Sequence, residues 1–142
     1  MRPHEISIAD VEYVAFKLAK LMFEWDEPIP AFGTRFPDKL ESCLAAPFQK
    51  YDKKYLYHGL LRKAAMLFYL MVKNHPFQNG NKRIAMTTLL VFLHDNKRWL
   101  RVPHNDLYDF ALSVAASEAR EKDRTIVDIE GFIKKYLIVL SP

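Results

Sequence analysis

Two long apolar segments, residues 55–74 and 81–95, are separated by only six residues in this chain of 142. The first, YLYHGLLRKAAMLFYLMVKN, carries apolar residues on nearly all sides of a helical projection, which is typical of a helix buried at the centre of a domain. The second, NKRIAMTTLLVFLHD, predicts another buried helix. A short polar loop between two buried helices must lie against the N-terminus of the second one.

Four further segments have helical patterns. Ser7 followed by Asp10 predicts a capping box for a helix ending at about Phe23. Residues 37–47, 104–117 and 125–140 predict the others, and Thr125 with Asp128 resembles a second capping arrangement. Period-two alternation is weak and confined to residues 32–36 and 99–102. We therefore predict an all-α fold, a single domain over residues 1–142, with at most a small β-hairpin.

Charge and composition limit the function classes. Lys and Arg outnumber Asp and Glu by 21 to 17, an excess that suits an anionic ligand but does not indicate direct nucleic-acid binding. The single cysteine, Cys43, suits a reducing compartment. Neither a signal-peptide core nor an uncharged run of about 20 residues is present, so we expect a cytoplasmic protein that does not bind membranes.

The loop and the helix start at residues 75–83 carry the candidate chemistry. Unpaired backbone N–H groups at Gly80, Asn81 and Lys82 would lie at the positive end of the helix dipole, where phosphates bind. Lys82 and Arg83 add positive charge, and His75 is of the type that acts as a general base near neutral pH. These residues predict phosphoryl or nucleotidyl transfer. The alternative is a plain helix stop, tight turn and solvated helix start.

The segment HPFQNGNKRIA resembles the signature of the Fic/Doc family, His-Pro-Phe-x-Asp/Glu-Gly-Asn-Gly/Lys-Arg, with eight of its nine positions acceptable here. The flanking segments KLESCLAAPFQKYD and MTTLLVFLHDNKRWL are similar to the compact Doc (death-on-curing) branch. The resemblance implies a compact Fic/Doc-type helical bundle. It also implies that His75 is the base, that Phe77 anchors the loop in the core, and that Gly80, Asn81 and Arg83 hold the phosphates of ATP.

Lys82 bears on which group is transferred. In the family that the motif resembles, Fic enzymes have glycine at this position and usually move AMP to a protein hydroxyl. Doc toxins have lysine and move the terminal phosphate of ATP to a translation elongation factor. Lys82 therefore favours a Doc-like phosphotransferase (kinase), with adenylyl transfer (AMPylation) as the lesser alternative. Met86, where Fic enzymes often have a second arginine, agrees with the Doc branch.

Asn79 departs from the family pattern. The family's acidic residue at this position ligates Mg²⁺, whereas an amide brings no negative charge to an ion that prefers carboxylates and phosphates. We therefore expect weak Mg²⁺ binding through Asn79. The chain could be a slow enzyme, a pseudo-enzyme that only binds, or a disarmed toxin. Deamidation of the Asn79-Gly80 pair to aspartate is a further hypothesis, which an unchanged peptide mass in aged protein would exclude.

Partners follow from the same resemblance. Family members present their protein substrate on a β-hairpin flap, for which Phe32, Gly33, Thr34 and Arg35 are the candidates, with an ordinary loop as the alternative. The inhibitory pattern Ser/Thr-x-x-x-Glu-Gly/Asn has no good match. A Doc-like toxin would therefore need a separate antitoxin chain that lays an amphipathic helix near the motif.

Two rival functions have sequence support. A non-catalytic binding module is favoured by Asn79. A ribonuclease toxin would use an Arg and a His a few residues apart, which Arg98 and His104 match loosely, although Pro103 between them prevents a shared helix. The five histidines lack the spacing of zinc ligands and no cysteine pair exists, so zinc is not implied.

Overall fold

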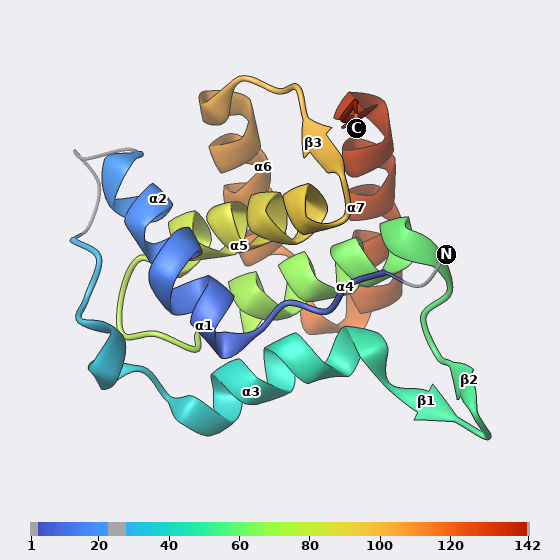
Figure 1. Cartoon of the computed structure of the whole chain (residues 1–142), viewed down its shortest axis with the longest axis horizontal. Coiled ribbons are helices and arrows are strands. Elements are labelled where there is room, and N and C mark those ends of the chain that lie inside the picture. Colours follow the sequence, from blue (N-terminus) through green and yellow to red (C-terminus); the bar gives the residue numbers. More distant parts are fainter. Residues whose placement is uncertain (1–2, 23–27, 142) are drawn as a thin grey trace.

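Helices α4 (Gly59–Lys73) and α5 (Asn81–Asp95) pack against each other through the centre of the molecule (Figure 1). This computed structural model describes residues 3–22 and 28–141. The prediction of two buried helices is confirmed, since most side chains of both lie in the core and α5 is buried along nearly its whole length. The first helix begins at Gly59 rather than Tyr55, because residues 54 and 55 belong to a strand.

The other helices surround this pair. Helix α7 packs on α4, α6 contacts both central helices, and α3 runs along the lower side of the molecule in Figure 1. The remaining helical elements, in chain order, are α1 (Ile8–Asp10), a π-helical segment (Val11–Ala15), α2 (Phe16–Leu21), a 3₁₀ turn (Phe32–Thr34), α3 (Pro37–Ala45), a 3₁₀ turn (Ala46–Phe48), α6 (His104–Ala116), a 3₁₀ turn (Ala119–Glu121) and α7 (Lys122–Tyr136). The all-α prediction is confirmed.

The first helical stretch begins as its capping residues predict. The Ser7 hydroxyl accepts a hydrogen bond from Asp10 N at 3.1 Å, and the Asp10 carboxylate accepts one from Ser7 N at 3.0 Å. Helix α2 ends at Leu21, while the expected end near Phe23 lies outside the described residues. The second expected capping box is wrong. Helix α7 begins at Lys122, and the Thr125 hydroxyl donates instead to the Glu121 carbonyl at 3.0 Å inside the helix.

Two short antiparallel strand pairs occur in the described part of the chain, and neither lies at residues 32–36. Strands β1 (Lys50–Tyr51) and β2 (Lys54–Tyr55) form a hairpin whose two turn residues both have positive φ, as a tight hairpin requires. Strand β3 (Arg98–Leu100) pairs with β4 (Leu137–Val139), which shows that the weak alternation after residue 98 was a strand. The predicted helix end at residues 137–140 is therefore wrong.

The longest helices of the described residues are shorter than a membrane-spanning helix. Helices α4, α5 and α7 have 15 residues each, whereas a span needs about 20 apolar residues. Within residues 3–22 and 28–141, no helix combines the length and the apolar character that a membrane crossing requires.

Candidate active site

The loop between α4 and α5 is bracketed by two residues in the left-handed region. His75 has φ 49° directly after the C-cap of α4, and Gly80 has φ 71° at the N-cap of α5. A non-glycine residue held there costs about 1–3 kcal/mol of strain, so the surrounding structure must impose it. An added Cβ on Gly80 would also lie 2.7 Å from the Ile29 Cδ1 atom. Glycine is therefore favoured at this position by its backbone conformation, and any larger residue would also displace the end of the Ile29 side chain.

Asn81 holds the loop in shape. Its side-chain Oδ1 accepts a hydrogen bond from Phe77 N at 3.0 Å, and its Nδ2 donates to Phe77 O at 2.9 Å. The Phe77 side chain is 1% exposed, and its ring centroid lies 5.0 Å from that of Phe16 and 6.2 Å from that of Phe32. The sequence suggested a phosphate ligand at Asn81, but its side chain is already committed to the loop backbone.

The candidate flap lies beside this loop but is not a hairpin. The Phe36 backbone N–H donates to the Pro76 carbonyl at 2.9 Å, which joins the segment to the loop. Phe32–Thr34 forms a 3₁₀ turn, closed by the Thr34 N–H and hydroxyl, which both donate to the Ala31 carbonyl at 3.0 and 2.7 Å. The hairpin prediction here is wrong because this local hydrogen bonding replaces a strand edge.

Arg35, the last of the flap candidates, is held by the same turn. Its guanidinium lies 4.3 Å from the centroid of the Phe32 ring, and its Nη1 donates to the Phe32 carbonyl at 3.3 Å. A cation over an aromatic face is attracted by the ring quadrupole. Both contacts keep Arg35 on its own turn and fix the position of Phe32 above Phe77.

The loop and the start of α5 enclose a cavity of about 210 Å³. Pockets that enclose a drug-sized ligand measure about 300–1,000 Å³, so this one suits the phosphate end of a nucleotide and leaves the rest outside. The structure brings five of the sequence-predicted site residues together here. The cavity is lined by His75, Asn79, Gly80, Asn81 and Lys82, together with Val72, Gln78 and Ala115.

The electrostatics of this cavity favour an anion. The N-cap residue of α5 is Gly80, which has no side chain to cap the first turn, and the positive end of the helix dipole lies at this cavity. Lys82 is half-buried and His75 is exposed at the rim. Within the described part of the chain, no carboxylate lines the cavity to oppose them.

Arg83 is not brought into the cavity, contrary to the prediction that it binds phosphate there. Its side chain is 3% exposed, and its Nη1 donates to the Met22 carbonyl at 2.9 Å. Met22 follows α2, and a carbonyl at a helix C-terminus lacks an intrahelical partner and carries partial negative charge. That carbonyl draws the guanidinium toward α2 and away from the loop.

The sequence did not show which element closes the cavity on its far side. Lys73, the last residue of α4, donates to the carbonyls of Ala115 and Ser117 at 3.1 and 2.5 Å, which fixes the C-terminal end of α6 beside the loop. A lysine at a helix C-terminus was the available signal, but its partners on α6 are 42 and 44 residues away. Long-range partners of this kind cannot be read from local patterns.

Cys43 lies on α3, close to the start of the loop. Burial raises the pKa of its thiol from 9.0 to about 11, and the hydrogen bond from Asn74 Nδ2, 4.0 Å from Sγ, opposes this only in part. The thiol is therefore protonated at neutral pH and packs as a small apolar group. Asn74 is the C-cap of α4, so this contact also helps to place the start of the loop.

The residues present do not fit a protein-bound Mg²⁺. Asn79 supplies an amide where the family signature has an acid, and the cavity offers no carboxylate among the described residues. No group of three or more His, Cys, Asp or Glu side chains with metal-binding geometry occurs in the described ranges either. Mg²⁺ prefers carboxylate and phosphate oxygens, and the described residues of this cavity supply neither.

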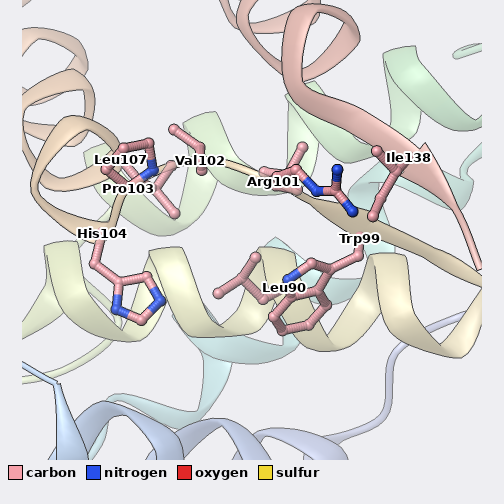
Figure 2. A pocket seen from close by; sticks show the side chains of 9 residues that line it. Leu90, Trp99, Arg101, Val102, Pro103, His104, Leu107 and Ile138 are labelled. Carbon is pink, nitrogen blue, oxygen red and sulfur yellow. The ribbon is translucent and has the colours of Figure 1, made fainter.

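The residues of the ribonuclease alternative line different cavities. His104 lies at the edge of a cavity of about 520 Å³, across from Trp99 and Arg101, with Leu90 between them (Figure 2). Arg98 lines another cavity, and its Nη1 donates to the carbonyls of Asn96 and Lys97. Arg98 and His104 therefore share neither of these two cavities, which does not favour an Arg–His nuclease.

The comparison with protein families agrees with this geometry. The model of the Fic/DOC family matches residues 6–93, which include the whole loop and most of α5. No curated protein and no solved structure matches the chain. The matched region ends before α6, so the helix that closes the far side of the cavity lies beyond it.

Proposed function

The chain belongs to the Fic/DOC family, and from that premise we propose that it transfers the γ-phosphate of ATP to a hydroxyl group of a protein. Members of this family are typically AMPylating or phosphorylating transferases. The observation that carries the proposal is the cavity at the α5 N-terminus, which is lined by a histidine, a lysine and the first residues of the helix.

In the proposed reaction the target hydroxyl loses its proton to the His75 imidazole as its oxygen attacks the γ-phosphorus. A new P–O bond forms to the target, the bond between the γ-phosphorus and its bridging oxygen breaks, and ADP leaves with that oxygen. The N–H groups at the start of α5 and the Lys82 ammonium hold the phosphate oxygens as charge shifts during transfer. ATP is thus a co-substrate.

Lys82 supports phosphate transfer over AMP transfer. The side chain lines a cavity of about 210 Å³, so it occupies space that a glycine at this position would leave to the ligand. The phosphate chain of ATP, entering beside Lys82, has less room to place its α-phosphorus next to His75. The terminal phosphate is then the group presented to His75.

The acceptor and the biological setting belong to the same proposal. A translation elongation factor is the protein target that the Doc resemblance suggests, and the chain would act as the toxin of a toxin–antitoxin pair. A separate antitoxin chain would supply the inhibition. The turn at Phe32–Thr34, joined to the loop through the bond from Phe36 N to Pro76 O, is the surface on which we place target contact.

A second candidate function is a catalytically impaired member that only binds nucleotide or partner. The observation that favours it is the amide at Asn79 in a cavity without a carboxylate, among the described residues. Transfer of phosphate needs charge neutralisation, which the described residues of this cavity supply through Lys82 and backbone dipoles.

ATP labelled at the γ-phosphate and, separately, at the α-phosphate distinguishes these functions. Incubation with an extract that contains elongation factors should label protein from γ-labelled ATP only. Label from the α position would show AMP transfer. No protein label from either, with nucleotide still bound, would establish the binding function.

A further inference from the structure

We propose that the cavity lined by Arg98, at the N-terminal end of α4, binds a phosphate group carried by a small organic molecule, with Lys63 and Arg98 as its cations. This cavity measures about 380 Å³. It lies at the opposite end of α4 from the motif loop, and the 15 residues of that helix span about 22 Å. The site is therefore separate from the transferase cavity.

Lys63 is the unusual residue of this region. It is 1% exposed, yet it lines the cavity. Its Nζ donates to the Tyr57 carbonyl and lies 4.0 Å from the centroid of the Tyr55 ring. Among the described residues no carboxylate forms a salt bridge with it. Lysine is almost never fully buried without a charged partner, and the Tyr57 carbonyl and the Tyr55 ring carry no net charge, so an anion in the cavity would supply the partner of opposite charge.

A second cation faces the same cavity. Arg98, on strand β3, lines the cavity and is half-buried, and its Nη1 atom donates to two backbone carbonyls. The remaining guanidinium N–H groups can bind phosphate oxygens as a pair. No Asp or Glu of the described ranges lines the cavity, so both positive charges act on whatever enters it.

Backbone donors and an apolar wall complete the site. Gly59 and Leu60 begin the first turn of α4 and line the cavity, and the side chain of the N-cap residue His58 makes no capping hydrogen bond. A phosphate has enough oxygens to accept from these N–H groups and from both cations at once. The Tyr55 ring and the Leu60 side chain supply an apolar surface for the organic part of the ligand.

Burial lowers the pKa of the Lys63 amine, because the ammonium loses hydration inside the protein. A bound dianion would restore a favourable partner for the charged form. Without a ligand the buried charge opposes folding, and a side chain of similar size without charge would remove that penalty. Lys63→Met is therefore expected to raise the thermal stability of the free chain while it abolishes binding.

The test uses the full chain and two probes, inorganic phosphate and phenyl phosphate, followed by amide NMR shifts. Both probes should shift the amides of Gly59 and Leu60, and phenyl phosphate should bind several-fold more tightly through its ring. Lys63→Met should weaken binding at these amides at least about tenfold, and Arg98→Gln should weaken it as well. Lys50→Met is the matched control, since its Nζ lies 4.8 Å from the same Tyr55 ring centroid but Lys50 does not line the cavity.

Shifts at the amides of Gly80 and Lys82 report separately on the transferase cavity, so failure of one proposal leaves the other measurable. Without phosphate, Lys63→Met should melt about 3 °C higher than the natural chain. Three results would each overturn the proposal: no shift at Gly59 and Leu60, equal affinity in Lys63→Met, or a lower melting temperature for that variant in phosphate-free buffer. A lower melting temperature would mean that Lys63 has a structural role alone, as the donor to the Tyr57 carbonyl.

Discussion

The side-chain amide of Asn81 brackets the backbone of Phe77, with 3.0 Å from Phe77 N to Oδ1 and 2.9 Å from Nδ2 to Phe77 O. This pair of hydrogen bonds joins the first residue of α5 to the middle of the motif loop. The shape of the cavity therefore depends on a residue whose side chain faces the protein rather than the ligand. The loop is positioned before any nucleotide arrives.

Replacing Asn81 with alanine should lower the free energy of unfolding. Both Phe77 backbone groups are buried and would lose their partners, which costs about 1–3 kcal/mol for each unsatisfied group. Urea unfolding measures this loss. The control is Asn105→Ala on the exposed surface of α6, which should change the free energy of unfolding by less than about 0.5 kcal/mol. Equal effects of the two variants would show that the bracket does not hold the loop.

Gly80→Ala and Gly131→Ala should have opposite effects. At Gly80 the positive φ and the 2.7 Å approach to Ile29 Cδ1 predict a loss of about 1–2 kcal/mol. Gly131 is inside α7 with open space around its Cβ position, so alanine should stabilise the helix by about 0.5–1 kcal/mol. Thermal melts of both variants test the pair. A Gly80→Ala chain as stable as the natural one would contradict the loop geometry.

Asn79→Asp should increase phosphate transfer and make it depend more strongly on Mg²⁺. A carboxylate at this position supplies the negatively charged Mg²⁺ ligand that the described residues of the cavity lack. A tenfold increase in the transfer rate would correspond to a decrease of about 1.4 kcal/mol in the activation barrier. Transfer rates over a Mg²⁺ titration measure both effects. Asn105→Asp adds the same charge on α6, at a residue that does not line the cavity, and should leave the rate unchanged. A slower Asn79→Asp enzyme would contradict the assignment.

The stability of the fold should decrease as the pH rises from about 9 to 11. In this range the folded chain keeps the proton on Cys43 that the unfolded chain loses, since the thiol pKa is raised from 9.0 to about 11. The protonated thiol stabilises the fold fully below pH 9, and the contribution, of the order of 2 kcal/mol, is lost on passing the higher pKa. Urea unfolding at pH 8 and pH 11 should show a smaller pH effect in Cys43→Ala. Identical pH effects would refute this.

Local patterns predicted the central helices well and the strands badly. The buried run from residue 81 to residue 95 and the Ser7–Asp10 cap depend on neighbouring residues, so the sequence contains their signal. The pairing of Leu100 with Leu137 depends on a partner 37 positions away, and a three-residue strand is too short to show alternation. The same distinction explains why the helix end at 137–140 was mispredicted.

The candidate site shows the same division. The motif loop and the start of α5 at Asn81 follow from adjacent residues, and the structure gathers them around one cavity. The sequence could not show that Arg83 binds the Met22 carbonyl, because that partner is 61 positions away. It also could not show the left-handed conformation of His75, which the surrounding structure imposes.

The His75→Asn variant, assayed with γ-labelled ATP, tests the central claim most directly. Asparagine tolerates the left-handed backbone at φ 49° better than most residues, so the fold should be kept, but it cannot accept the proton. His104→Asn, in the cavity of about 520 Å³, is the matched control. We predict that His75→Asn lowers label transfer at least about 100-fold while His104→Asn retains it. Undiminished transfer by His75→Asn would contradict the account.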